Sequence, residues 1–290
     1  MRSLLFVPGD NEKKLAKALA SEADALIVDL EDSVAAPAKA AARATTAVFL
    51  AEARARAKRP QLYVRVNGLD SGFAAADLDA VMGNAPDGIV LPKCRNGADV
   101  QRLAAKLAVR EAEHGLVDGA TRILAIATES AQAMFGLASY RGASARLVGL
   151  AWGAEDLSAD LGAETNRLPG GAYAAPYALA RTLTLIGAVA AEVAPIDAAF
   201  TNFRDAEGLR AEAEAARREG FVAKLAIHPA QIAIINAVFT PSPEVIAKAR
   251  AVLAAFAAAP DAGVVSLDGE MLDLPHLTRA RKVLERAGLT

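Results

Sequence analysis

Short apolar runs alternate along the chain with longer alanine-rich segments whose apolar residues recur at helical spacing. The short runs are rich in β-branched residues and apolar almost throughout, which is typical of strands buried on both faces of a parallel sheet. We predict eight such strands: Leu4–Val7, Ala25–Leu30, Leu62–Val66, Gly88–Leu91, Ile123–Ala127, Leu147–Ala151, Ile196–Phe200 and Ala223–Ile227. Eight strand–helix repeats in about 230 residues favour a (β/α)8 TIM barrel, with a doubly wound sheet as the alternative.

The segments between the predicted strands carry helical signals. Asn11–Ala20 opens with Asn and Glu, as a capped helix start should. Val100–Glu113 and Ala206–Arg218 place charged residues on one face and alanine or leucine on the other, which is typical of a surface helix.

The strand–helix repeat ends after Phe239, where the proline-rich range Thr240–Pro243 follows. The tail is expected to hold a helix up to Ala258, a short apolar run at Val264–Leu267 and a last helix from about Leu277 to Ala287. We therefore predict a barrel over residues 1–239 and a C-terminal appendage over residues 240–290.

Composition and charge narrow the class of protein. The chain has 290 residues, 53% hydrophobic and 23% charged, so it can build a large core and is not expected to be disordered. Its net charge, 32 − 34 = −2, argues against nucleic acid or an anionic membrane as a partner. The single Cys94 excludes an internal disulfide, and the apolar runs are too short for a signal peptide or a membrane span. We expect a cytoplasmic protein.

Polar side chains gather where the predicted strands end. In a (β/α)8 barrel these ends form one rim, and that rim carries the chemistry. The rim candidates are Asp29, Glu31, Asp32, Arg65, Asn67, Lys93, Glu129, Glu155, Asp156, Asp197 and His228. Asp32 and Asp156 could each be a helix cap, but capping does not explain the whole set.

Glu129 and Asp156 follow adjacent predicted strands, so their carboxylates can meet near the barrel mouth. Three more acids belong to the same rim: Glu31, Asp32 and Glu155. Crowded carboxylates are costly unless a cation or protons compensate them, and oxygen ligands without a His or Cys cluster favour Mg2+. The alternative is a ring of salt bridges between these acids and three basic residues: Arg65, Lys93 and Lys224.

Arg65 lies within an apolar strand, where an unpaired charge is expensive. Its partner is either a substrate carboxylate gripped by the guanidinium fork or one of the rim acids. The Gly153-Ala154 turn before a helix offers free backbone N–H groups that suit a second contact to an anion. Cys94 is expected to pack as a buried apolar residue. No GxGxxG, P-loop or GxSxG signature is present in the sequence.

Eight short motifs follow one another along nearly the whole chain: Arg2–Gly9, Asp29–Val34, Val64–Asn67, Leu91–Lys93, Glu129–Ser130, Gly153–Leu157, Ile227–Gln231 and Gly269–Asp273. In this order and spacing they resemble the citrate lyase beta-subunit-like family, which includes malyl-CoA and citramalyl-CoA lyases. The resemblance implies a TIM barrel in which Glu129 and Asp156 bind Mg2+ and Arg65 grips the oxo-acid or thioester side of the substrate.

The resemblance also gives the tail a role. Family members are trimers or hexamers in which a C-terminal extension reaches over a neighbour's active site, so residues 240–290 become a lid. Asp273 matches the carboxylate that this lid supplies, with Asp268 as a nearby competitor. Asp273 could instead merely cap a helix that starts near Pro275.

The implied reaction is a reversible Claisen-type cleavage of a 3-hydroxyacyl-CoA into acetyl-CoA and a 2-oxo acid. Mg2+ would polarise the oxo-acid carbonyl, and Asp273 would move the proton of the acetyl methyl group. Glu31 and Asp32, which lie in the motif Asp29–Val34, are the other candidate catalytic acids. The other candidates for substrate contact are Asn67, Lys93, Gly153, Ala154 and Glu155.

Four other interpretations stay open. Related aldolases act on free 4-hydroxy-2-oxo acids and place a catalytic His near the end of the second strand, where this chain has Glu31-Asp32-Ser33. An acyl-carrier-dependent citrate lyase beta subunit and a malyl-CoA thioesterase would use the same rim. A non-catalytic barrel predicts the loss of Glu129, Asp156, Arg65 or the lid acid, and all are present.

Overall fold

The computed structural model describes residues 1–289, which form two compact units. The first spans Met1–Asn236, and the second begins at Ala237, inside a helix that runs over Ile232–Phe239 (α9). That residues 1–239 form the catalytic domain stays a prediction.

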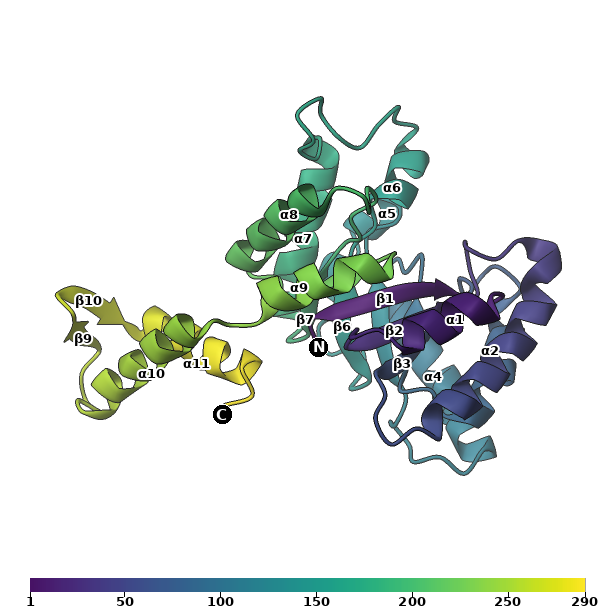
Figure 1. Cartoon of the computed structure of the whole chain (residues 1–290), viewed down its shortest axis with the longest axis horizontal. Coiled ribbons are helices and arrows are strands. Elements are labelled where there is room, and N and C mark those ends of the chain that lie inside the picture. Colours follow the sequence, from purple (N-terminus) through teal and green to yellow (C-terminus); the bar gives the residue numbers. More distant parts are fainter. Residues whose placement is uncertain (290) are drawn as a thin grey trace. The chain divides into compact units, whose positions relative to one another are not determined.

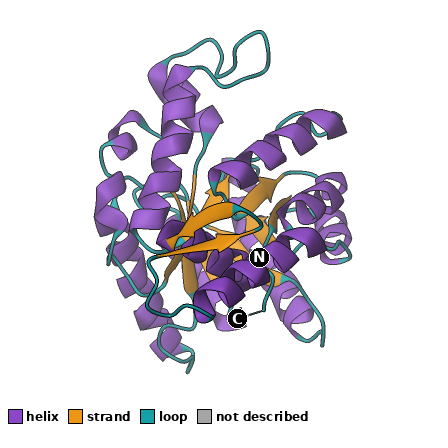
Figure 2. Ribbon diagram, turned by 90° about the vertical axis from the view of Figure 1, so that its left-hand side faces the viewer, coloured by secondary structure: helices purple, strands orange, loops and turns teal. Residues whose placement is uncertain are grey.

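The first unit is a closed barrel of eight parallel strands in chain order, with β1 paired to both β2 and β8. The strands are β1 Ser3–Pro8, β2 Ala25–Asp29, β3 Gln61–Arg65, β4 Gly88–Leu91, β5 Arg122–Ile126, β6 Leu147–Ala151, β7 Ala194–Asp197 and β8 Ala223–Ala226. Figure 2 shows them at the centre of a ring of helices. The predicted (β/α)8 barrel is confirmed, and the doubly wound sheet is wrong.

One predicted strand is displaced. Strand β7 was expected at Ile196–Phe200 but occupies Ala194–Asp197. The carbonyl of Phe200 accepts a hydrogen bond from the Gln231 side chain at 2.8 Å, so the backbone there is bound to a side chain rather than to a strand. The other predicted strand ends differ from the observed ones by one residue at most.

The barrel interior is filled by apolar side chains from every strand, which explains why these runs show little alternation. Gly88 makes room for the ring of Tyr63, because a Cβ at Gly88 would lie 2.3 Å from that ring. The parallel register sets Asp29 of β2 opposite Arg65 of β3, at the carboxyl ends of both strands. The strand pairing therefore already brings together two residues of the predicted rim.

Helices connect the strands. They are α1 Glu12–Leu19, α2 Lys39–Arg54, α3 Ala74–Val81, α4 Gly97–Glu113, α5 Ala131–Met134, α6 Ala154–Leu161, α7 Ala175–Ala190 and α8 Ala206–Glu219, with single 3-10 turns at Ala36–Ala38, Met82–Asn84, Leu137–Tyr140 and Pro229–Gln231. The side chain of Asn11 caps α1, as predicted. Helix α4 begins before the predicted Val100 because the side chain of Asn96 accepts the N–H groups of Ala98 and Asp99.

The second unit joins helix α10 (Pro243–Ala257), a hairpin of β9 (Val264–Leu267) and β10 (Glu270–Asp273), and helix α11 (Leu274–Arg286). These elements share their own apolar core, and Figure 1 labels them. The hairpin turn uses Asp268 and Gly269, both with positive φ, as two-residue turns require. Strand β10 was not predicted, because Glu270–Asp273 lacks β-branched residues.

None of the helices within residues 1–289 is long and apolar enough to cross a membrane.

Candidate active site

Arg65 and Asp29 form a two-pronged ion pair at the ends of β3 and β2. Nε and Nη2 of Arg65 each donate to one oxygen of the Asp29 carboxylate, both at 2.7 Å. Nη1 lies 3.0 Å from Oε2 of Glu31. Burial would raise the pKa of Asp29, but the Arg65 guanidinium outweighs it and holds that pKa below its usual range. Arg65 therefore has the anionic partner its strand requires, and that partner is a rim acid.

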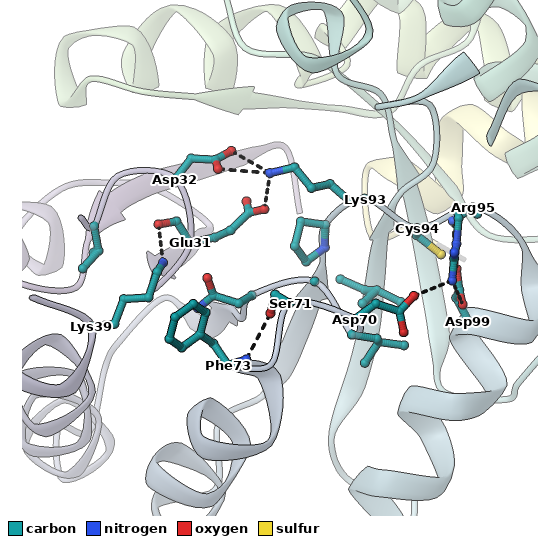
Figure 3. A pocket seen from close by; sticks show the side chains of 16 residues that line it. Glu31, Asp32, Lys39, Asp70, Ser71, Phe73, Lys93, Cys94, Arg95 and Asp99 are labelled. Carbon is teal, nitrogen blue, oxygen red and sulfur yellow. Dashed lines mark hydrogen bonds and ion pairs between the residues drawn. The ribbon is translucent and has the colours of Figure 1, made fainter. Parts of the chain in front are cut away.

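Lys93 follows β4 and lies among the acids of the mouth. Its ammonium Nζ is 2.5 Å from Oε1 of Glu31 and 3.0 Å from Oδ1 of Asp32. Figure 3 shows the Lys93 side chain pointing toward these two acids. It also lies 3.5 Å from Oδ1 of Asp156, in the first turn of α6. The backbone N–H of Lys93 donates to Oε2 of Glu129. Lys93 thus links acids carried by three different strand–helix loops.

Glu129 is the most unusual acid of the site. Glu129 is 5% exposed, and its carboxylate accepts a hydrogen bond from a backbone N–H rather than from a cationic side chain. Burial, followed by the negative charge of Asp156, raises the pKa of Glu129 to about 8. Burial likewise raises the pKa of Glu31 to about 7, although Arg65 and Lys93 oppose this rise. Proximity of like charges and desolvation are the causes expected for a functional cluster.

Gly153, immediately before α6, makes room for Glu129. A Cβ at Gly153 would lie 2.9 Å from Cγ of Glu129, closer than real Cβ atoms come. The small residue therefore lets Glu129 and the start of α6 approach each other. Ala154 is the buried first residue of that helix. Within residues 1–289, no side chain caps the N–H groups at the start of this helix, so the predicted contact to an anion stays a prediction.

Five carboxyl groups lie at this mouth: Asp29, Glu31, Asp32, Glu129 and Asp156. Arg65 and Lys93 pair with four of them, whereas Glu129 accepts a backbone N–H. The Lys39 ammonium adds a third cation nearby, bound to the carbonyls of Leu30 and Glu31. The carboxyl groups outnumber these cations, and their hard oxygens fit a divalent cation such as Mg2+. Within residues 1–289, no group of three or more His, Cys, Asp or Glu is arranged to hold a metal. That Glu129 and Asp156 bind Mg2+ stays a prediction, and two carboxylates are within the number of protein ligands that Mg2+ takes.

A cavity of about 560 Å³ adjoins this cluster on the side of β2, β3 and β4. Asn67 is one of its lining residues, and Figure 3 shows Glu31, Asp32 and Lys93 on one side of it and Phe73 on another. The sequence pattern singled out the three charged residues but not Phe73, because an aromatic residue at a loop end carries no polar signal. The cavity offers a small molecule room beside the charged groups.

Some predicted site residues are engaged elsewhere. Asn67 is buried, and its side-chain N–H groups donate to the Leu30 carbonyl and to Asp77. Glu155 points to a different partner, since its Oε1 accepts a hydrogen bond from Asn166 at 2.8 Å. That these two residues contact substrate stays a prediction, and in this structure their side chains are held by protein partners.

Lys224 lies apart from the mouth cluster within the barrel unit, and Asp273 belongs to the second unit. Lys224 does not join the expected ring with Arg65 and Lys93; its Nζ binds Asp197 at 2.6 Å and Glu212 at 2.9 Å. Asp273 belongs to the second unit, where it starts α11 and its carboxylate contacts Nδ1 of His276. That contact holds the pKa of Asp273 below its usual range.

Two further residues have structural roles. The rim candidate His228 accepts the N–H of Ala230 and caps the turn after β8, and its ring stacks on Phe203. Cys94 is buried as expected, and burial raises the pKa of its thiol to about 12, so it is not a nucleophile at neutral pH.

Comparison with known proteins identifies relatives along the whole chain. The chain is 35% identical over 288 residues to citrate lyase subunit beta of Leuconostoc mesenteroides, covering 99% of this chain and 93% of that protein. It is 38% identical over 292 residues to a (3S)-malyl-CoA thioesterase of Cereibacter sphaeroides, covering 99% and 94%. The crystal structure of CitE from Mycobacterium tuberculosis, in complex with magnesium, acetoacetate and coenzyme A, matches with a TM-score of 0.80 and 34% identity, covering 99% and 98%.

The family model named HpcH/HpaI aldolase/citrate lyase matches residues 2–229, which spans all eight strands of the barrel and the mouth residues described above. This match, the full-length relatives and the closed barrel agree with one another. The chain belongs to the HpcH/HpaI aldolase/citrate lyase family and is an enzyme of the lyase type.

Proposed function

We propose that this protein is a Mg2+-dependent carbon–carbon lyase that cleaves, or forms, a 3-hydroxyacyl-CoA. Its products would be acetyl-CoA and a 2-oxo acid, and malyl-CoA, citramalyl-CoA and citryl-CoA are the candidate substrates. The observation that carries the proposal is the buried carboxyl of Glu129, held by a backbone N–H and close enough to Asp156 for that charge to raise its pKa. The complex of the Mycobacterium tuberculosis relative with magnesium, acetoacetate and coenzyme A supports it.

In this proposal Glu129 and Asp156 hold Mg2+. When bound, the ion supplies Lewis-acid polarisation of the oxo-acid carbonyl. Arg65, fixed by Asp29 and Glu31, contributes a positive charge that does not have to reorganise during the reaction. Glu31 and Asp32 hold the Lys93 ammonium beside the cavity.

Asp273 is the proposed acid–base group. In the condensation direction ionised Asp273 removes a proton from the acetyl methyl group, and the oxo-acid carbonyl oxygen takes up a proton from water as it becomes the 3-hydroxyl. In the cleavage direction the bond between C2 and C3 of the acyl chain breaks, the 3-hydroxyl proton passes to water, and protonated Asp273 gives its proton to the acetyl carbon and is reprotonated from water. Its carboxyl is 44% exposed, so water can reach it, and the contact with His276 lowers its pKa and favours the ionised form that condensation requires. We propose that it acts in a neighbouring subunit of a trimer or hexamer, with the second unit as the lid.

A thioesterase is the second candidate function. The relative from Cereibacter sphaeroides named (3S)-malyl-CoA thioesterase shares 38% identity along the whole chain, which favours this alternative on similarity alone. Water attacking the thioester carbonyl would release CoA thiol and leave the hydroxy acid intact. The two activities therefore differ in their products even if they share a substrate.

The deciding experiment is an assay of malyl-CoA, citramalyl-CoA and citryl-CoA, with free 4-hydroxy-2-oxo acids as controls, in Mg2+ and in EDTA. We expect acetyl-CoA plus an oxo acid, formed in Mg2+ and abolished by EDTA. Release of CoA thiol with an intact hydroxy acid would establish the thioesterase. Activity on the free acids alone would establish an aldolase, and inactivity on both would favour the carrier-dependent subunit or a non-catalytic barrel.

Two variants test the assigned residues. Asp156→Ala should lose Mg2+ dependence and turnover together while the fold stays intact, and cleavage at the parental rate would contradict the metal assignment. Asp273→Asn should keep oxo-acid binding but suppress proton exchange at the acetyl-CoA methyl. Asp268→Asn, in the turn of the same hairpin, is the matched control and should exchange normally.

A further inference from the structure

Lys93 contacts both members of the proposed metal pair through two different groups. Its backbone N–H donates to Glu129, and its Nζ lies 3.5 Å from Asp156. The same ammonium is closer still to Glu31 and Asp32, at 2.5 and 3.0 Å. The four acids surround one residue, which is 44% exposed and can therefore move its side chain.

The backbone of Lys93 is strained in a way that serves these contacts. Its φ is +51°, the left-handed region that costs a residue with a Cβ about 1 kcal/mol and that glycine adopts freely. A glycine would keep the N–H toward Glu129 but would carry no ammonium. A lysine at this position supplies a positive charge although its backbone conformation is unfavourable. Strained residues of this kind are typical of functional sites.

A divalent cation bound by Glu129 and Asp156 would share Asp156 with the ammonium of Lys93. Two positive charges on one carboxylate repel each other, and the ammonium has Glu31 and Asp32 as alternative partners within reach. Binding of the metal would therefore release Lys93 from Asp156 and leave it on the acids that line the cavity.

On this basis, which rests on the proposed metal site, we infer that Lys93 is an internal competitor for the divalent metal. Its ammonium neutralises Asp156 and so weakens metal binding, while its N–H positions Glu129 as a ligand. The residue is a positioning residue in this scheme: it sets how tightly the site takes its metal and keeps the surplus of carboxylates compensated when the metal leaves.

The test is direct binding of Mg2+ by calorimetry, with Mn2+ and electron paramagnetic resonance as a second probe, on full-length protein stripped with EDTA. Lys93→Gln removes the charge and keeps the N–H; we expect metal affinity to rise about tenfold, because one nearby positive charge is lost. Lys93→Gly also relieves the positive φ and should show the same tightening. Lys93→Arg keeps the charge and is the matched control, with affinity close to that of the parent.

Each outcome separates the inference from the proposed function. If the parent protein binds no Mg2+ or Mn2+, the metal site of the proposed function fails and the inference with it. If the parent binds metal but folded Lys93→Gln and Lys93→Gly bind it equally or more weakly, the inference is overturned while the metal site stands. A purely structural lysine predicts the second result, with a lower melting temperature that metal does not restore.

Discussion

Two clusters in the barrel unit contain the same types of charged residues, but they differ in how far cationic side chains compensate the carboxylates. At the mouth, five carboxylates surround Arg65 and Lys93, and the pKa of Glu129 rises to about 8. Beside β7 and β8, Lys224 and Asp197 are 0% exposed and bind each other at 2.6 Å. Burial would raise the pKa of Asp197, yet Lys224 and Arg181 outweigh it and lower that pKa.

Each charged side chain of the cluster beside β7 and β8 has an oppositely charged partner, although Nη2 of Arg181 is buried without a hydrogen bond. Asp197 accepts hydrogen bonds from Nε1 of Trp152 at 2.8 Å and from Nε of Arg181 at 3.0 Å, and Lys224 also binds Glu212 at 2.9 Å. Buried charges that find their partners stabilise one arrangement of the chain, whereas a missing partner is very costly. The contrast indicates that matched charges hold the barrel together and that the unmatched surplus at the mouth is available for a ligand.

The cluster beside β7 and β8 also includes a residue of the segment between α6 and α7, which Figure 1 shows as a long loop. Arg167 of this loop donates to Glu212 at 2.8 Å and stacks 3.9 Å from the ring of Tyr173, which meets Trp152 edge to face. Trp152 directly precedes Gly153. The stabilising cluster therefore supports the segment that carries the mouth residue Asp156.

The largest effect that would test this contrast is expected from Lys224→Met. It leaves Asp197 and Glu212 without their shared ammonium, so the free energy of unfolding should fall by about 3–5 kcal/mol. Urea unfolding of EDTA-treated protein, followed by circular dichroism, measures it.

Two control variants are compared with Lys224→Met in the same unfolding measurement. The matched change at the mouth, Glu129→Gln, removes a carboxyl whose charged form is disfavoured by burial and by Asp156, so stability should stay the same or rise. Arg141→Met removes an exposed ion pair with Glu192 and should change little. If Lys224→Met cost no more than Arg141→Met, the contrast between the two clusters would be wrong.

An intermediate effect is expected from pH. Because the folded-state pKa of Asp197 is lowered, the native state holds fewer protons than the unfolded chain near pH 4. The stability from this carboxylate is present above its unfolded pKa of about 3.9 and is lost as the pH falls through the lower folded value. Parent protein should therefore lose more stability between pH 5 and pH 3 than Asp197→Asn does, relative to their values at pH 6, as urea titrations at each pH would measure.

The exposed acid Asp10 supplies the control for pH, since Asp10→Asn should leave the acid limb of the parent unchanged. Equal slopes for the parent and Asp197→Asn would mean that the ion pair with Lys224 does not stabilise the native state through its charge.

The smallest effect is expected from Gly153→Ala. The added Cβ would press on Cγ of Glu129 at 2.9 Å and shift that carboxyl, so Mg2+ binding should weaken about tenfold while stability changes by only about 1 kcal/mol. Gly170→Ala is the matched control, because a Cβ there meets open space. Calorimetry measures the Mg2+ affinity of both variants. Equal affinities would show that a Cβ at residue 153 does not displace the carboxyl of Glu129.

Much of the barrel could be predicted from the apolar runs. Seven of the eight strands lie within one residue of their predicted ends, because uninterrupted apolar runs between helical segments admit few other arrangements. The candidate mouth was also predictable in outline, since strand ends of a parallel barrel meet at one rim. Glu31, Asp32, Arg65, Lys93 and Asp156 do form one connected set of ion pairs.

Which partner each charged side chain takes was not predictable. Lys224 looks like another rim candidate in the sequence, yet it lies within β8 and pairs with Glu212 of α8. Hydropathy does not reveal this, because strands buried on both faces leave no polar side to mark direction. Asn67 likewise follows a strand, but its amide is taken by Asp77 of α3.

The sequence by itself determined the repeat, the barrel and the polar residues that meet at its mouth, because these depend on periodicity and on the order of short segments. The tertiary structure alone decided the balance of charge. The charge of a buried acid is compensated only when a cation lies within a few ångströms. Asp197 has such a cation in Lys224, whereas Glu129 faces the like charge of Asp156. Distances of that kind are set by packing, so they separate the stabilising cluster from the candidate active site.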